Sequence, residues 1–147
     1  MTMSVVQALK ATLDYEVDAI ASGLGLDFVD LDGVALNSER LLEANNAIAW
    51  QKTGGTTGTG PWFDLTFDVG AITNNSTDPN QQVSASLVDA IVSRFQPGTT
   101  VDVYPYPDTS SKLACFLVSS AQEQPRVADV VEGFRAVTIT GTGVKLA

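Results

Sequence analysis

Residues 60–70 read Gly-Pro-Trp-Phe-Asp-Leu-Thr-Phe-Asp-Val-Gly and carry the clearest structural pattern in the chain. Within them the apolar residues Phe63, Leu65, Phe67 and Val69 alternate with polar ones. Alternation with a period of two is typical of a strand that has one face against a core and the other in solvent. The stretch therefore predicts a half-buried β-strand.

A glycine-rich segment precedes this strand. Residues 53–61 read Thr-Gly-Gly-Thr-Thr-Gly-Thr-Gly-Pro, and residues 44–50 before them alternate in the manner of another strand. Two strands joined by small residues predict a long β-hairpin with a mobile tip. The glycines do not make a phosphate loop, because such loops end in Gly-Lys-Ser/Thr or lead directly into a helix, whereas Trp62 and a strand follow here.

The N-terminal segment predicts an amphipathic helix. Ser4 and Gln7 have the spacing of a capping box, and Gly23 is a natural stop. Apolar residues recur between them at spacings of three and four, which places them on one helix face: Val5, Leu9, Leu13, Val17 and Ile20.

A second helix is predicted to begin at Asp78. Asp78 suits the N-cap, Pro79 the first helical position, and Gln81 completes a capping box. Its apolar face is expected to consist of Leu87, Val88, Ile91 and Phe95.

Further strands are expected on either side of the second helix. Residues 26–31 and 101–103 read as short strands, and Val137 and Ile139 alternate with threonines near the end of the chain. The continuous apolar run 113–118 predicts a strand buried on both faces, with Cys115 as a small core residue. Residues 1–147 are therefore predicted to form a single α+β domain. An antiparallel or mixed β-sheet would carry two amphipathic helices on one face and a long glycine-rich hairpin.

The charge balance narrows the range of partners. Eight Lys and Arg stand against 17 Asp and Glu, which gives a net charge of −9. Such a chain is expected to repel nucleic acid and anionic membranes, because both are polyanions. The stretch 1–20 contains a single base and three acids, so it predicts neither a signal peptide nor a membrane span, and we expect synthesis in a cytoplasm.

No motif predicts an enzyme, a cofactor or a metal. The chain contains no histidine, so mechanisms that need an imidazole base or ligand are excluded. Asp30, Asp32 and Glu39 have the spacing of three ligands of a calcium loop, but Phe28 stands at the first ligand position. An acidic turn is the favoured interpretation of that stretch.

The order of these features resembles that of the tail terminator proteins of long-tailed bacteriophages. The resemblance rests on the Trp-ended strand, the glycine-rich hairpin, the helix led by Asp-Pro, the stretch Val-Asp-Val-Tyr-Pro-Tyr at 101–106 and the strand that follows Gly-Phe-Arg at 133–135. It extends over roughly residues 1–145 and concerns the order of elements rather than any invariant motif.

The resemblance implies a structural virion protein of the tail or neck, made in the host cytoplasm. Such a protein forms a homohexameric ring that caps the tail tube and presents a surface to the head–tail connector. DNA passes through the channel of the ring without specific binding. The residues expected to contact partners are those of the hairpin tip and the tryptophan after it: Gly54, Gly55, Thr56, Thr57, Gly58, Thr59, Gly60 and Trp62.

Other interpretations remain open. Another neck or head-completion protein could share the fold and differ only in its binding surfaces. A small acidic α+β domain that binds a ligand would need a concave pocket with convergent polar groups. A cellular adaptor could have the same layout.

Overall fold

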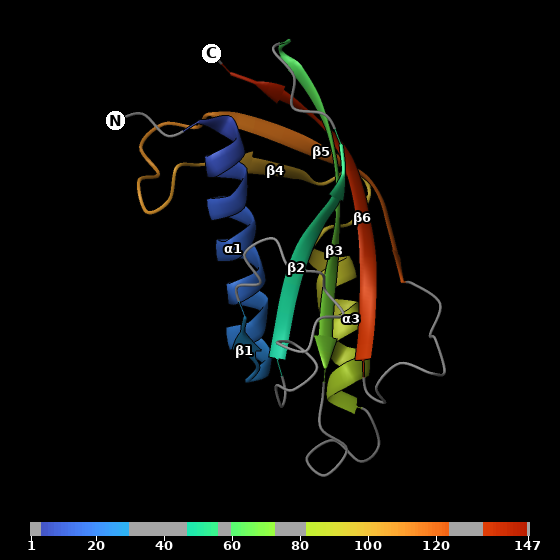
Figure 1. The fold of residues 1–147 in the computed structure, drawn as a ribbon. Coiled ribbons are helices and arrows are strands. Elements are labelled where there is room, and N and C mark those ends of the chain that lie inside the picture. The colour runs from blue at the N-terminus through green and yellow to red at the C-terminus, as the bar shows by residue number, and fades with distance from the viewer. Residues whose placement is uncertain (1–3, 30–46, 56–59, 73–81, 124–133, 147) are drawn as a thin grey trace.

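The computed structural model describes residues 4–29, 47–55, 60–72, 82–123 and 134–146. These residues form a mixed α+β arrangement (Figure 1). In chain order the elements are α1 (Val5–Leu24), β1 (Asp27–Phe28), β2 (Ala47–Gly54), β3 (Trp62–Ile72), α3 (Gln82–Arg94), β4 (Thr100–Val103), β5 (Ala114–Glu123) and β6 (Phe134–Lys145). The predicted α+β class is confirmed. The helix start predicted at Asp78–Gln81 and the acidic stretch 30–39 lie outside the described residues.

Helix α1 begins as its sequence predicts. The Gln7 N–H donates to Ser4 Oγ at 3.2 Å, and the Ser4 N–H donates to Gln7 Oε1 at 3.0 Å. The predicted stop at Gly23 is wrong, because the helix continues to Leu24 and is capped by Gly25. Gly25 has φ 70°, a left-handed conformation that glycine adopts without steric cost.

Strand β3 lies inside the sheet, whose strand order is β1-β2-β3-β6-β5-β4. It pairs antiparallel with β2 on one side and with β6 on the other, where the register runs from Trp62–Val144 to Ile72–Phe134. The only parallel pair among the described strands is β1 with β2, so the sheet is mixed. The strand predicted at 63–69 is thereby confirmed and extends beyond both predicted ends.

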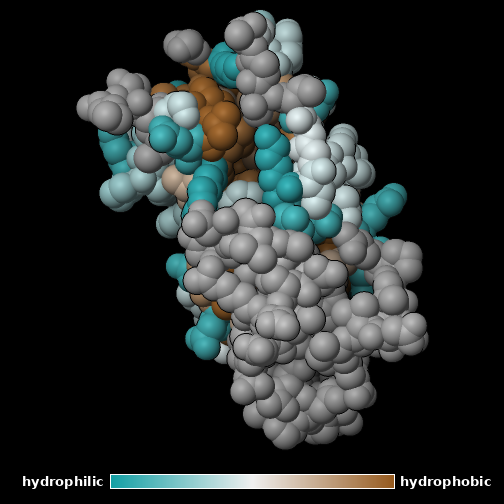
Figure 2. Space-filling view, viewed as in Figure 1, coloured by the Kyte–Doolittle hydropathy of each residue, from teal (hydrophilic) through white to brown (hydrophobic). Residues whose placement is uncertain are grey.

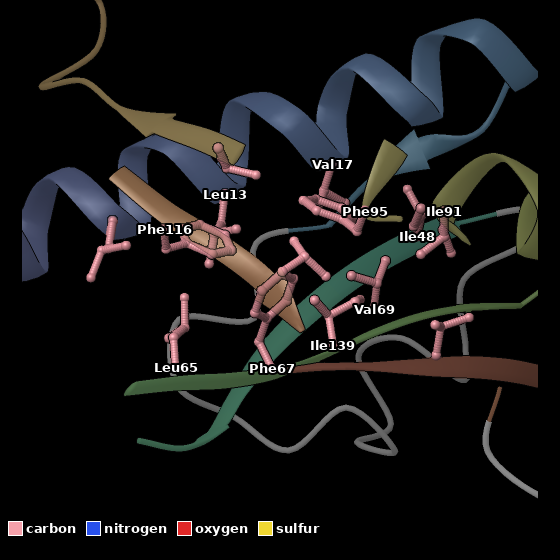
Figure 3. Close-up of a cluster of buried hydrophobic side chains, with 14 of the residues drawn as sticks. Leu13, Val17, Ile48, Leu65, Phe67, Val69, Ile91, Phe95, Phe116 and Ile139 are labelled. Carbon is pink, nitrogen blue, oxygen red and sulfur yellow. The ribbon is translucent and has the colours of Figure 1, made fainter. Parts of the chain in front are cut away.

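The core gathers around Phe67 (Figure 3). Phe63, Leu65, Phe67 and Val69 are all buried, and they belong to one cluster with the buried residues of α1 and α3. The ring of Phe67 makes edge contacts with three other aromatic rings, at centroid distances of 6.4, 5.4 and 6.3 Å: Trp50, Phe95 and Phe116. One side chain of β3 thus joins β2, the end of α3 and β5.

Polar contacts tie the helices to each other and to the sheet. Thr12 of α1 is buried, and its Oγ1 donates to Tyr104 O at 3.2 Å and accepts from the Tyr104 N–H at 3.1 Å. Arg94 of α3 donates to both carboxylate oxygens of Glu16 on α1, at 2.6 and 2.7 Å. Both contacts join residues far apart in sequence, so they fix α1 against β4 and α3.

Strand β5 differs from its prediction. Only the face with Ala114, Phe116 and Val118 enters the core, while Leu117 is 51% exposed and Cys115 is half-buried on the opposite face. The prediction that the run is buried on both faces, with Cys115 in the core, is therefore wrong. The physical reason is that β5 meets β4 and β6 through its edges, and just one of its faces meets the cluster that contains the helices.

Replacing Phe67 with Ala is expected to lower the free energy of unfolding by about 3–5 kcal/mol, because it removes a buried ring and leaves a cavity. Chemical denaturation measures this change. Thr66→Ala, one residue earlier on the opposite face of β3, is the control and should cost less than about 0.5 kcal/mol. A loss of less than about 1 kcal/mol in the free energy of unfolding for Phe67→Ala would contradict the conclusion that the core gathers around this ring.

Candidate interaction surface

The structure places four of the eight predicted contact residues where β2 ends and β3 begins. Gly54 ends β2, Gly55 follows it, Gly60 comes just before β3, and Trp62 is the first residue of β3. The other four lie outside the described residues: Thr56, Thr57, Gly58 and Thr59. Trp62 is 68% exposed, an unusual position for so large a ring.

The chain just after β2 requires glycine at one position. Gly55 has φ 109°, and a Cβ atom there would lie 2.2 Å from the carbonyl oxygen of Asp64. The β2–β3 pairing also shifts register between Lys52 and Gly54, as at a β-bulge. This close approach of two backbones determines the path on which the chain leaves β2.

Trp62 lies on the face of the sheet opposite to Phe63 and Phe67, which we call the outer face. In the register of the sheet, Trp62 is opposite Val144 of β6, and Val144 is opposite Cys115 of β5. Leu117 lies two residues beyond Cys115 on the same face of β5. Cross-strand and diagonal neighbours of this kind contact one another. We call these four residues the outer apolar patch: Trp62, Cys115, Leu117 and Val144.

Sequence reasoning found Trp62 and missed the other residues of the outer apolar patch. Leu117 and Cys115 lie in a continuous apolar run, whose periodicity does not distinguish the outer from the inner residues. Val144 stands between Gly143 and Lys145, where no alternating apolar pattern marks it. The available signal was the pairing of β6 with its two neighbours, which only the fold supplies.

Next to the patch, the outer face carries acids and hydroxyls. Thr138 Oγ1 donates to Asp68 Oδ1 at 2.8 Å, and Thr142 Oγ1 lies 3.4 Å from Asp64 Oδ1. Asp102 of β4 is opposite Cys115, so a carboxylate also borders the outer apolar patch on that side. The patch is thus an uncharged area at one end of the outer face, bordered by acids and hydroxyls.

Further apolar side chains are exposed at the same end of the molecule. Helix α1 begins and β6 ends there, at the same end as the end of β2 and the start of β3 (Figure 1). Val6 is 52% exposed and Leu146 is 43% exposed. Figure 2 shows hydrophobic residues gathered at the upper end of this view, among hydrophilic ones.

The chemistry of this surface suits contact with another protein. Large exposed apolar residues framed by polar ones mark interaction sites rather than ordinary surface. Among the residues that the structure describes, no three His, Cys, Asp or Glu side chains are grouped to hold a metal ion. Within the same residues, neither helix is long and apolar enough to cross a membrane.

Comparisons with known proteins add little to this geometry. No family model and no curated protein matches the chain. Among the solved structures that match, one is similar over 99% of this chain and 98% of its own, with 12% sequence identity and a TM-score of 0.49. A likeness at that level leaves the function to be argued from the surface itself.

Replacing Gly55 with Ala is expected to lower the free energy of unfolding by about 1–3 kcal/mol, because the new methyl group would press on the Asp64 carbonyl in a strained conformation. Gly54→Ala is the matched control. A Cβ atom at Gly54 would lie 3.7 Å from Thr66 Cβ, an ordinary contact. Equal stabilities of the two variants in chemical denaturation would show that the backbone after β2 is not constrained at Gly55.

Proposed function

We propose that this chain is a structural virion protein that caps a bacteriophage tail tube as a homohexameric ring. The ring would offer an attachment surface to the head–tail connector and leave a channel for DNA. The observation that carries the proposal is the outer apolar patch, with Trp62 exposed beside the base of the hairpin. The resemblance in the order of elements suggests which assembly this contact surface serves.

The charge of the chain explains why an apolar patch is needed for self-association. Each copy carries a net charge of −9, so two copies repel one another at long range. Attraction must then come from uncharged surface that leaves water on contact. Trp62 and Leu117 supply such surface, and large aromatic residues of this kind commonly dominate the energy of protein interfaces.

The acidic part of the outer face suits a conduit for DNA. Asp64 and Asp68 lie in line along β3, with threonines of β6 opposite them. Carboxylates repel phosphates, so DNA that passes such a wall is not held by it. A face of this composition would let DNA pass rather than bind it.

The proposal includes the finer architecture that the sequence predicts. In it both amphipathic helices pack on one face of the sheet, and the glycine-rich hairpin reaches a neighbouring subunit or the tail tube. Support comes from the single buried cluster that α1 and α3 share with Phe63, Leu65 and Phe67 of β3. The opposite face of β3 is thereby left to other contacts.

The double substitution Trp62→Ser and Leu117→Ser is expected to abolish ring formation and leave the fold intact, because both side chains are exposed. Light scattering and negative-stain imaging measure this. The unaltered chain should give six-fold rings near six times its mass of 15.5 kDa, alone or on purified tail tubes. The double variant should remain monomeric.

Thr140→Ala is the matched control, since it changes the outer face away from the outer apolar patch, and it should assemble as the unaltered chain does. Two results would contradict the proposal. One is a double variant that still forms rings. The other is an unaltered chain that forms no ring either in solution or on tail tubes.

A further inference from the structure

The three tyrosines of the chain meet in one cluster, although they are far apart in sequence. Tyr15 lies on α1, and Tyr104 and Tyr106 follow β4. The rings of Tyr15 and Tyr106 are stacked, with centroids 4.4 Å apart and planes 11° from parallel. Tyr104 meets Tyr106 edge to face at 5.9 Å. We call these residues the tyrosine cluster.

The backbone that carries the tyrosine cluster is held by hydrogen bonds. Both backbone polar groups of Tyr104 bond to the buried hydroxyl of Thr12, as described above. The Asp108 N–H donates to Pro105 O at 3.1 Å and closes a turn around Tyr106. The rings are therefore ordered before any partner arrives, which reduces the entropy lost on binding.

The tyrosine cluster faces solvent in spite of its internal stacking. Tyr15 is 54% exposed although Tyr106 covers one face of its ring, so the other ring face is open. Tyrosine is enriched at protein interfaces because it offers a large rigid ring together with a polar hydroxyl. Burial and the nearby Glu16 carboxylate raise the pKa of Tyr106 above its ordinary value, and a tyrosine hydroxyl is a hydrogen-bond donor at neutral pH even without that shift.

The charges around the tyrosine cluster are mainly negative. Arg94, whose charge acts on Tyr106, donates to both carboxylate oxygens of Glu16. Asp18 is exposed one helical turn after Tyr15, and Asp108 is exposed two residues after Tyr106. Hydrogen bonds from Ser110 lower the pKa of Asp108, which keeps it charged.

Two further ion pairs each join one positive side chain to one negative side chain, so neither pair changes the net charge. Lys112 Nζ lies 3.4 Å from Asp102 Oδ1, and Lys10 Nζ lies 2.9 Å from Asp14 Oδ2. Asp18 and Asp108 are further exposed carboxylates, close in sequence to Tyr15 and Tyr106.

We propose that the tyrosine cluster is a second contact surface, which receives an arginine-bearing segment of a partner protein. A guanidinium is planar and stacks on an aromatic face, where the negative ring face attracts its charge. The flanking carboxylates complement that charge. A second copy of this acidic chain is disfavoured as the occupant by its own net charge of −9. The inference goes beyond the proposed ring and does not depend on it.

The test titrates the full-length chain with the capped peptide Gly-Arg-Gly-Arg-Gly at near-physiological salt and follows the tyrosine ring signals by NMR. The expected result is a saturable shift of Tyr15 and Tyr106 signals, with an affinity that Tyr15→Ala lowers about three- to fivefold. Tyr15→Phe is the matched control, because it keeps the ring face and should retain the affinity. Both variants change an exposed side chain, and their thermal midpoints verify that they fold.

Two further controls separate stacking from general attraction of charges. Asp64→Asn removes an acid from the outer face of the sheet and should leave the affinity unchanged. The lysine counterpart of the peptide should bind more weakly, since an ammonium cannot stack. Three results would overturn the proposal. One is an affinity for the peptide that Tyr15→Ala leaves unchanged, and another is an affinity that Asp64→Asn lowers as much as Tyr15→Ala does. The third is self-association of the chain that requires Tyr15.

Discussion

The edge contacts of the Phe67 ring hold the separate parts of the fold together. This ring meets Trp50 of β2, Phe95 at the end of α3 and Phe116 of β5. Buried aromatic rings contribute large apolar areas, and edge contacts fix the angles at which they meet. Because Phe67 stands in β3, the position of that strand determines where the helix and the two other strands must lie.

Space for these rings is made by small residues on β6. A Cβ atom at Gly143 would lie 2.2 Å from the ring of Phe63, and one at Gly141 would lie 3.0 Å from the ring of Phe116. The inner face of the sheet is thus filled by aromatic rings laid over glycines. The outer face carries the alternate side chains of the same strands, and at one end these include Trp62 and Leu117. The same alternation that builds the core therefore exposes the outer apolar patch.

Local patterns could be predicted from the sequence, and contacts between distant segments could not. The strand at 63–69 and the start of α1 follow from short periodicities and a capping box, which neighbouring residues specify. The helix stop was misplaced by two residues because the sequence does not reveal which glycine adopts a positive φ. Trp62 was singled out because it follows the glycine-rich segment, whereas the exposure of Leu117 depends on which face of β5 enters the core. The tyrosine cluster joins residues 15 and 106, and only tertiary structure brings them together.

The central claim is that another subunit covers the outer apolar patch, and the chain carries its own reporter for it. Cys115 is the single cysteine, and it lies half-buried within the patch. The most direct measurement compares the rate at which a thiol reagent modifies Cys115 in the dissociated chain and in the assembled ring. Our account predicts that assembly slows the reaction at least about tenfold, as expected when contact excludes the reagent from a thiol. Equal rates in the two states would contradict it.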